Sequence, residues 1–370
     1  MKSHNKSATP AERSTAPTAG SRVSKGARGG TSSRGGASNR AGEGNRADKG
    51  NRAPAGRLFT WPLIIGVIVT AALVTVSLFV GEYDIFSGQD GASIFQITRI
   101  PRTIALVLAG AAMAMSGLVM QMLTQNRFVE PTTTGTTEWA GLGLLLTMVI
   151  APDASVLTRM VIAVASAFVG TLIFFAFLSR IQLRSSVIVP IVGLMLGAVV
   201  GALSNFIALQ TNLLQSLGIW FAGSFTSVLR GQYEPLWIVV AVVIAIFIAA
   251  DRFTVAGLGK DIATNVGLNY NRIILLGTAL VALASGLVTV VVGNLPFLGL
   301  VVPNVVSLFR GDDLRSNLPW VCLAGISLVT ICDLVGRTII APFEVPVSLI
   351  LGIIGSIVFV ALLLQRRRGR

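Results

Sequence analysis

Asp333 and Arg337 are two charged residues, four positions apart, in a stretch of otherwise apolar sequence. A carboxylate inside a long apolar run is a candidate proton- or ion-binding group. At this spacing on a helix, however, the guanidinium of Arg337 can reach and neutralise the carboxylate of Asp333. We favour a structural pair, with a proton relay as the alternative. We expect Asp333 to be the only carboxylate embedded in an apolar segment.

The residues of familiar enzyme chemistry are scarce or misplaced. The only histidine, His4, is close to the N-terminus. Cys322 and Cys332 would be about 15 Å apart along a helix, too far for a disulfide. Gly259-Lys260 is followed by Asp261, where a phosphate-binding loop needs Ser or Thr. We therefore predict no catalytic, cofactor-binding or metal-ligating residue, and any ATP hydrolysis must take place on another subunit.

The composition is that of a membrane protein. Apolar residues make up 53% of the chain and charged residues 12%, and the mean hydropathy is +0.77. Soluble domains carry about twice as many charged residues. We therefore expect most of this chain to lie within a lipid bilayer.

The positive charge is concentrated in the N-terminal segment. Residues 1–57 hold +9 of the net charge of +13 and almost no large apolar side chains. Such a segment cannot offset its ordering entropy by burial. We predict a disordered, basic, cytoplasmic tail over 1–57 and a transmembrane domain over 58–370. RNA binding by the tail is a less favoured reading than a solvated tail that sets orientation.

Apolar runs alternate with short polar breaks after Trp61, which predicts an all-α polytopic membrane protein with about ten transmembrane helices. The predicted spans are 61–80, 100–122, 137–151, 158–178, 187–209, 235–250, 273–292, 296–310, 318–336 and 345–364. Several are shorter than the ~20 residues of a full crossing, so broken helices are expected. Segment 212–229 is expected to form a short surface helix. Lys and Arg gather in the breaks on the side of the tail, which places both termini in the cytoplasm.

One inner break has the pattern of a short amphipathic helix. It runs from Leu258 to Leu268, and Ile262, Ala263 and Val266 have helical spacing. Gly267 is a natural helix stop. Such a helix could lie on lipid or dock into a groove on a partner protein.

Arginines mark the opposite, outer side. Arg99 and Arg102 open one span and Arg337 closes another. A guanidinium suits bidentate contacts with carboxylates on a visiting protein. Contact with lipid headgroups is the plainer interpretation.

Taken together, these segments resemble the permeases of vitamin B12 and iron-siderophore ABC importers, the BtuC/FecCD type. The similarity covers about 60–370. The motifs that carry it are Arg99-Ile-Pro-Arg-Thr103, Leu108-Ala-Gly-Ala-Ala112, Ser116-Gly117, Gln125-Asn-Arg-Phe-Val-Glu-Pro131, Leu258–Leu268, Pro296-Phe-Leu-Gly-Leu-Val-Val-Pro303, Cys332-Asp-Leu-Val-Gly-Arg337 and Glu344-Val-Pro346.

The resemblance implies a type II ABC importer permease fold and a multi-pass protein of the bacterial cell membrane. The implied partners are ABC ATPase subunits, a second permease copy or paralogue, a substrate-binding lipoprotein or periplasmic protein, and membrane lipid, with no nucleic acid. By analogy, the ATPase coupling helix comprises Leu258, Gly259, Lys260, Asp261, Ile262, Ala263, Val266 and Gly267. Arg99, Arg102 and Arg337 would receive carboxylates of the binding protein.

Two departures from the family pattern point to one branch. A Val-Pro-His sequence is common in the family where this chain has Pro303-Asn304, and Lys260 stands at a position that is often acidic. Both features resemble the branch that serves iron-siderophores such as petrobactin, or catecholate siderophores generally, more than the B12 permeases. An ion-coupled secondary transporter of a small polar solute is the alternative function, and a non-transporting membrane scaffold is a third.

Overall fold

The computed structural model describes residues 61–80, 91–180, 188–311, 313–340 and 342–368. These residues belong to a unit that spans Pro54–Arg370. The predicted tail, residues 1–57, lies outside the described residues.

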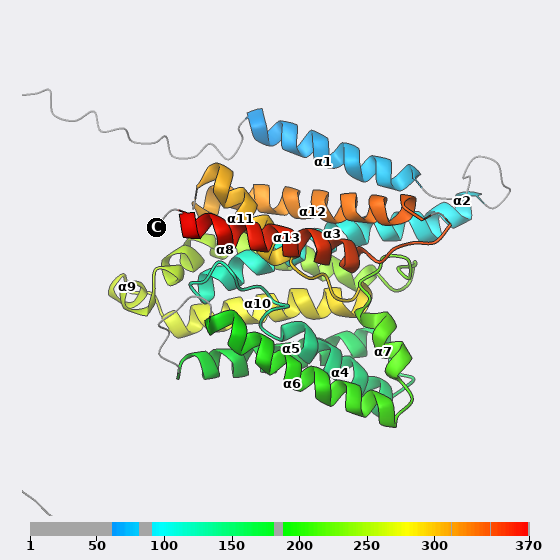
Figure 1. Cartoon of the computed structure of the whole chain (residues 1–370), viewed down its shortest axis with the longest axis horizontal. Coiled ribbons are helices and arrows are strands. Elements are labelled where there is room, and N and C mark those ends of the chain that lie inside the picture. Colours follow the sequence, from blue (N-terminus) through cyan, green and yellow to red (C-terminus); the bar gives the residue numbers. More distant parts are fainter. Residues whose placement is uncertain (1–60, 81–90, 181–187, 312, 341, 369–370) are drawn as a thin grey trace, which may run out of the picture. The chain divides into compact units, whose positions relative to one another are not determined.

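Helices are the only extended regular elements in the described part of the chain (Figure 1). Eight apolar helices are long enough to cross a membrane. They are built on α1 (Trp61–Phe79), α3 (Ile100–Leu123), α5 (Val156–Leu178), α6 (Ile188–Gln210), α8 (Ile238–Gly257), α10 (Tyr270–Val291), α12 (Leu314–Thr338) and α13 (Val347–Arg368). The predicted all-α, multi-pass fold is confirmed.

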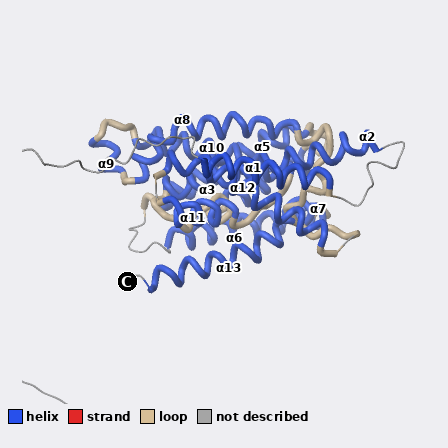
Figure 2. The backbone as a smooth tube through the Cα atoms, turned by 90° about the horizontal axis from the view of Figure 1, so that it is seen from above, coloured by secondary structure: helices blue, strands red, loops and turns tan. Residues whose placement is uncertain are grey.

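Shorter helices connect or complete these spans. Two are apolar, α4 (Thr136–Ile150) and α11 (Leu298–Arg310). The others are α2 (Gly91–Ile94), the π-helix η1 (Phe95–Arg99), α7 (Leu214–Phe221), the 3-10 helix η2 (Glu234–Trp237) and α9 (Lys260–Asn265). Figures 1 and 2 place α9 and the C-terminal end of α13 at one end of the bundle, and α2 and α7 at the other.

Each predicted span contains a helix, but two of the helices are too short to cross alone. At 1.5 Å per residue, the 15 residues of α4 and the 13 of α11 extend for ~22 and ~20 Å. The apolar core of a bilayer is ~30 Å thick. The expected surface helix within 212–229 is also shorter than predicted and covers only Leu214–Phe221.

Helix α3 lies at the centre of the bundle, where it contacts α8, α10, α11 and α12. Its run of small residues explains this position, because small side chains let helix backbones approach closely. A Cβ atom on Gly110 would lie 2.9 Å from the Gly325 carbonyl oxygen of α12. The small-residue motif of α3 therefore builds the core of the fold.

The start of α4 lies near the middle of the bundle's length. Gly135, with φ of 80°, precedes α4 and packs against Gly197 of α6. Gly197 is nine residues after Ile188 and thirteen before Gln210, or ~14 and ~20 Å from the two ends of α6. The loop 124–135 therefore enters the bundle and turns back into α4 at about half its depth.

Candidate functional site

Glu130 lies in this entering loop and holds the N-terminus of α11. Its buried carboxylate accepts hydrogen bonds from the backbone N–H groups of Phe297 (2.8 Å) and Leu300 (3.0 Å), and from the Thr132 hydroxyl (2.5 Å). The first N–H groups of a helix have no partner within the helix and carry partial positive charge. A carboxylate supplies both the acceptors and the opposite charge, so α11 can begin inside the protein.

Further contacts fix α11 to α3 and to the same loop. The Gln121 side chain donates to the Gly299 carbonyl (3.1 Å), and the Asn304 side chain donates to the Arg127 carbonyl (2.8 Å). With Glu130, these bonds hold α11 at its start and its middle. We therefore treat α3, loop 124–135 and α11 as one mechanical unit.

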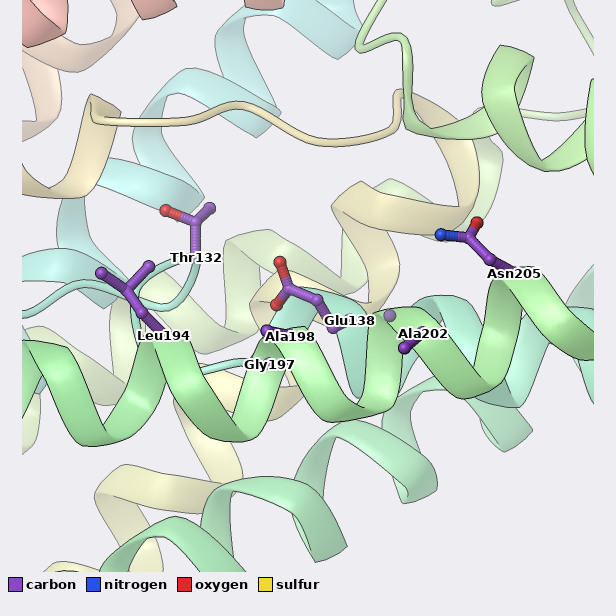
Figure 3. Close-up of a pocket in the computed structure, with 8 residues that line it drawn as sticks. Thr132, Glu138, Leu194, Gly197, Ala198, Ala202 and Asn205 are labelled. Atoms are coloured by element: carbon purple, nitrogen blue, oxygen red, sulfur yellow. The ribbon is translucent and has the colours of Figure 1, made fainter.

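A groove that carries several polar groups runs along α6 between α4 and α7, and we name it the Glu138 groove. Two adjoining cavities of about 440 and 300 Å³ share Glu138, Gly201 and Asn205. The first is also lined by Thr132, Leu194, Gly197, Ala198 and Ala202, and the second by Ser204, Leu214, Leu217, Gly218 and Phe221. Figure 3 shows the polar groups of Thr132, Glu138 and Asn205 on the same side of α6.

The expectation that Asp333 is the only embedded carboxylate is wrong. Glu130 is buried in a loop that reads as a polar break, and Glu138 lies in the first turn of the apolar helix α4. Glu130 was missed because a polar break in the sequence normally lies at the surface, whereas this loop enters the bundle. The available signal was that Glu138 is the second residue of the predicted span 137–151.

Four charged side chains, Arg102, Asp333, Arg337 and Glu344, form an ionic cluster near the start of α3 and the end of α12. Arg102 is 2.7 Å from Asp333 and 2.9 Å from Glu344, and Arg337 is 2.5 Å from the other oxygen of Asp333. Burial alone would raise the pKa of Glu344, but hydrogen bonds from Arg102 and Thr226 outweigh it and the pKa lies below its ordinary value. The cluster joins α3, α12 and the loop before α13.

Arg337 of the cluster and the neighbouring Arg99 also bind the backbone at the end of α1. Arg337 donates to the Val80 carbonyl (2.8 Å), and Arg99 donates to the Phe79 carbonyl (3.1 Å). The side chains of Arg102 and Arg337 are only 14% and 6% exposed. The structure thus brings Arg102 and Arg337 together around Asp333 and places Arg99 separately, and the three do not form an open row of cations.

At the opposite end, α9 presents apolar side chains to its surroundings. The helix begins after Gly259, with φ of 111°, and is followed by Gly267, with φ of 85°. Ala263 is buried against the bundle, whereas Leu258, Ile262 and Val266 are 59%, 47% and 68% exposed. Ile262 and Val266, four residues apart, lie on one face of α9, and Leu258 ends α8 on the other side of Gly259. Lys260 and Asp261 are also exposed.

Comparison with known protein families shows which family has this architecture. The model of the FecCD transport family matches residues 59–365. The chain belongs to the FecCD transport family. The resemblance drawn from the motifs is confirmed, and this FecCD protein is a multi-pass permease subunit of the cell membrane.

Curated relatives of this FecCD permease include two petrobactin permeases. It is 57% identical to the petrobactin import system permease protein FatD of Bacillus anthracis, over 85% of this chain and 94% of the relative. It is 41% identical to the petrobactin import system permease protein YclN of Bacillus subtilis, over 80% and 95% of the two chains.

A solved structure supports the fold of this FecCD permease. An inward-facing structure of a metal-chelate type ABC transporter superposes with a TM-score of 0.70 at 21% identity, covering 82% of this chain and 99% of the other. In the described residues there is no group of three or more His, Cys, Asp or Glu side chains that could hold a metal ion.

Proposed function

We propose that this permease forms the membrane passage of an ATP-driven importer that carries iron(III)-siderophore chelates, of the petrobactin type, into the cytoplasm. The observation that carries the proposal is the 57% identity to a petrobactin permease along nearly its whole length. The Glu138 groove supports it, because it is a cavity between apolar helices that carries the polar groups of Thr132, Glu138, Ser204 and Asn205.

The energy would come from ATPase subunits docked on α9. The exposed side chains of Ile262 and Val266, with Leu258 at the end of α8, offer a short apolar surface, and α9 lies at the end of the bundle opposite α7. Burial of such apolar side chains in a groove of a partner protein would stabilise the complex. Because Ala263 anchors α9 to the bundle, a movement of the ATPase would be passed directly to the permease.

The outer end would receive a substrate-binding lipoprotein or periplasmic protein. Arg102 is the arginine best placed for this role, since its ion pair with Glu344 is the more exposed of its two contacts. An incoming carboxylate would replace Glu344 and leave Arg102 bound to Asp333. Arg99 and Arg337 would support the site by holding the end of α1. A second permease copy or paralogue completes the proposed passage.

Reconstitution tests the proposal. The permease is placed in vesicles with its ATPase, and uptake of radioactive ferric petrobactin is measured with loaded binding protein outside and ATP inside. We expect uptake only when all partners and ATP are present. Uptake by the permease alone, driven by an ion gradient, would establish the secondary-transporter alternative and overturn the proposal.

A further inference from the structure

The Glu138 groove connects the outer end of the bundle with its middle. The second cavity is lined by Leu217 and Phe221 of α7, at the end of the bundle opposite α9, which the proposed function places outside, and the first reaches Thr132 in the entering loop. Along α6 the two cavities extend from Leu194 to Asn205, or ~16 Å. Glu138 lines both, so cargo that entered from outside along this groove would pass it.

The polar groups of the groove are mainly hydrogen-bond acceptors. Glu138 contributes a carboxylate, which receives one hydrogen bond from the Thr137 hydroxyl at 3.0 Å. The Thr132 and Ser204 hydroxyls already donate, to Glu130 and to the Val200 carbonyl, so each offers lone pairs to the groove. Asn205 adds an amide that can donate or accept.

No lysine or arginine is among the described residues that line the two cavities. A carboxylate at this depth interacts strongly with other charges, because the surrounding dielectric is low. It attracts an ammonium or an amide N–H and repels an anion. The groove therefore favours the part of a chelate that carries nitrogen donors over the part that carries anionic iron ligands.

Small residues keep the space in front of Glu138 open. A Cβ atom on Gly197 would lie 3.5 Å from the carboxyl carbon of Glu138, and one on Gly201 would meet no atom within 4 Å. With Ala198 and Ala202, these glycines form the floor of the groove on α6. The carboxylate is thus reachable by a group larger than water.

We propose that Glu138 is a specificity-determining residue of the passage, which binds a cationic amine or another N–H donor of the chelate's organic scaffold as the cargo moves inward. The proposal rests on the proposed function, because it assumes that a chelate travels through this permease. It adds the chemical class that the passage recognises and the residue that recognises it.

The test compares two ferric chelates with the same iron-binding groups. One has free amines in its linker, and in the other those amines are acetylated. ATP-driven uptake of each is measured in vesicles that hold the complete importer, with the binding protein saturated by the chelate in use. The permease variants are Glu138→Gln, Glu138→Asp and, as a matched control outside the groove, Glu234→Gln at an exposed site.

We expect Glu138→Gln to lower uptake of the amine chelate about tenfold, the effect of losing one hydrogen bond to a charged group, and to change uptake of the acetylated chelate much less. Glu138→Asp should retain the preference for the amine, and Glu234→Gln should match the unmodified importer. An equal loss for both chelates would show a structural role and overturn the proposal, as would no loss. If the unmodified importer took up neither chelate, the proposed function itself would fail.

Discussion

Gly117 of α3 and Gly299 of α11 are in direct backbone contact, and a methyl group on Gly117 would lie 2.1 Å from the Gly299 carbonyl oxygen. Neither backbone can retreat easily, because α11 is also fixed by Glu130 and Gln121. This contact sets how closely the short helix approaches the central one.

Gly117→Ala is therefore expected to destabilise the permease by more than about 2 kcal/mol, since overpacking of this kind forces backbone shifts. The measurement is the midpoint of thermal unfolding in detergent. Gly352→Ala is the control, because a Cβ atom there would meet nothing within 4 Å. Equal midpoints for the two variants would show that α11 can move away at little cost.

Substitutions of Glu130 should differ in how many helix N–H groups lose their acceptor. Glu130→Gln loses the charge and keeps an acceptor for one of the N–H groups of Phe297 and Leu300, whereas Glu130→Leu leaves both without an acceptor. An unsatisfied buried donor costs about 1–3 kcal/mol. We expect Glu130→Leu to lower the unfolding midpoint clearly more than Glu130→Gln. The reverse order would contradict the capping role of Glu130.

Asp333 should matter for stability and not for energy coupling. Two arginines share its carboxylate, and removing one partner of a buried charge network costs about 3–5 kcal/mol. Asp333→Ala should therefore lower the unfolding midpoint strongly. Asp333→Asn, which keeps the shape, should retain ATP-driven uptake in vesicles. Complete loss of uptake in a folded Asp333→Asn permease would favour a proton relay.

The contribution of Glu344 should depend on pH. Its pKa lies below the ordinary value, so its stabilising effect is complete above the ordinary carboxyl pKa and is lost as the pH falls through the lowered pKa. The difference in unfolding midpoint between the unmodified protein and Glu344→Gln should be largest near neutral pH, at about 1 kcal/mol or less for a partly exposed pair. It should vanish in acid. A difference that grows in acid would contradict the assigned direction.

The exposed face of α9 should be needed for coupling and not for folding. Ile262→Asp and Val266→Asp place charge on a surface that contacts little of the permease. We expect an unchanged unfolding midpoint and at least a tenfold loss of uptake, because burying an unpaired charge in a partner's groove is costly. Thr264→Asp, at an exposed position two residues from each, is the control. Normal uptake in the Ile262 and Val266 variants would refute coupling through this face.

Hydrophobic runs in the sequence determined the membrane class and the approximate helix positions, because a helix that crosses lipid must be apolar along nearly its whole length. The motifs from Arg99 to Glu344 determined the family. Local pattern also located α9, since its apolar spacing and Gly267 act within a few residues.

Only the tertiary structure decided how deep each polar residue lies. Loop 124–135 reads as an ordinary surface break, yet it enters the bundle, and Glu130 can be buried there because the N-terminus of α11, distant in sequence, supplies its partners. Arg102 likewise gains its partners, Asp333 and Glu344, from other elements, whereas the spacing of Asp333 and Arg337 on one helix predicted their pair. Burial and the charge pairs between distant segments depend on contacts that no local pattern encodes.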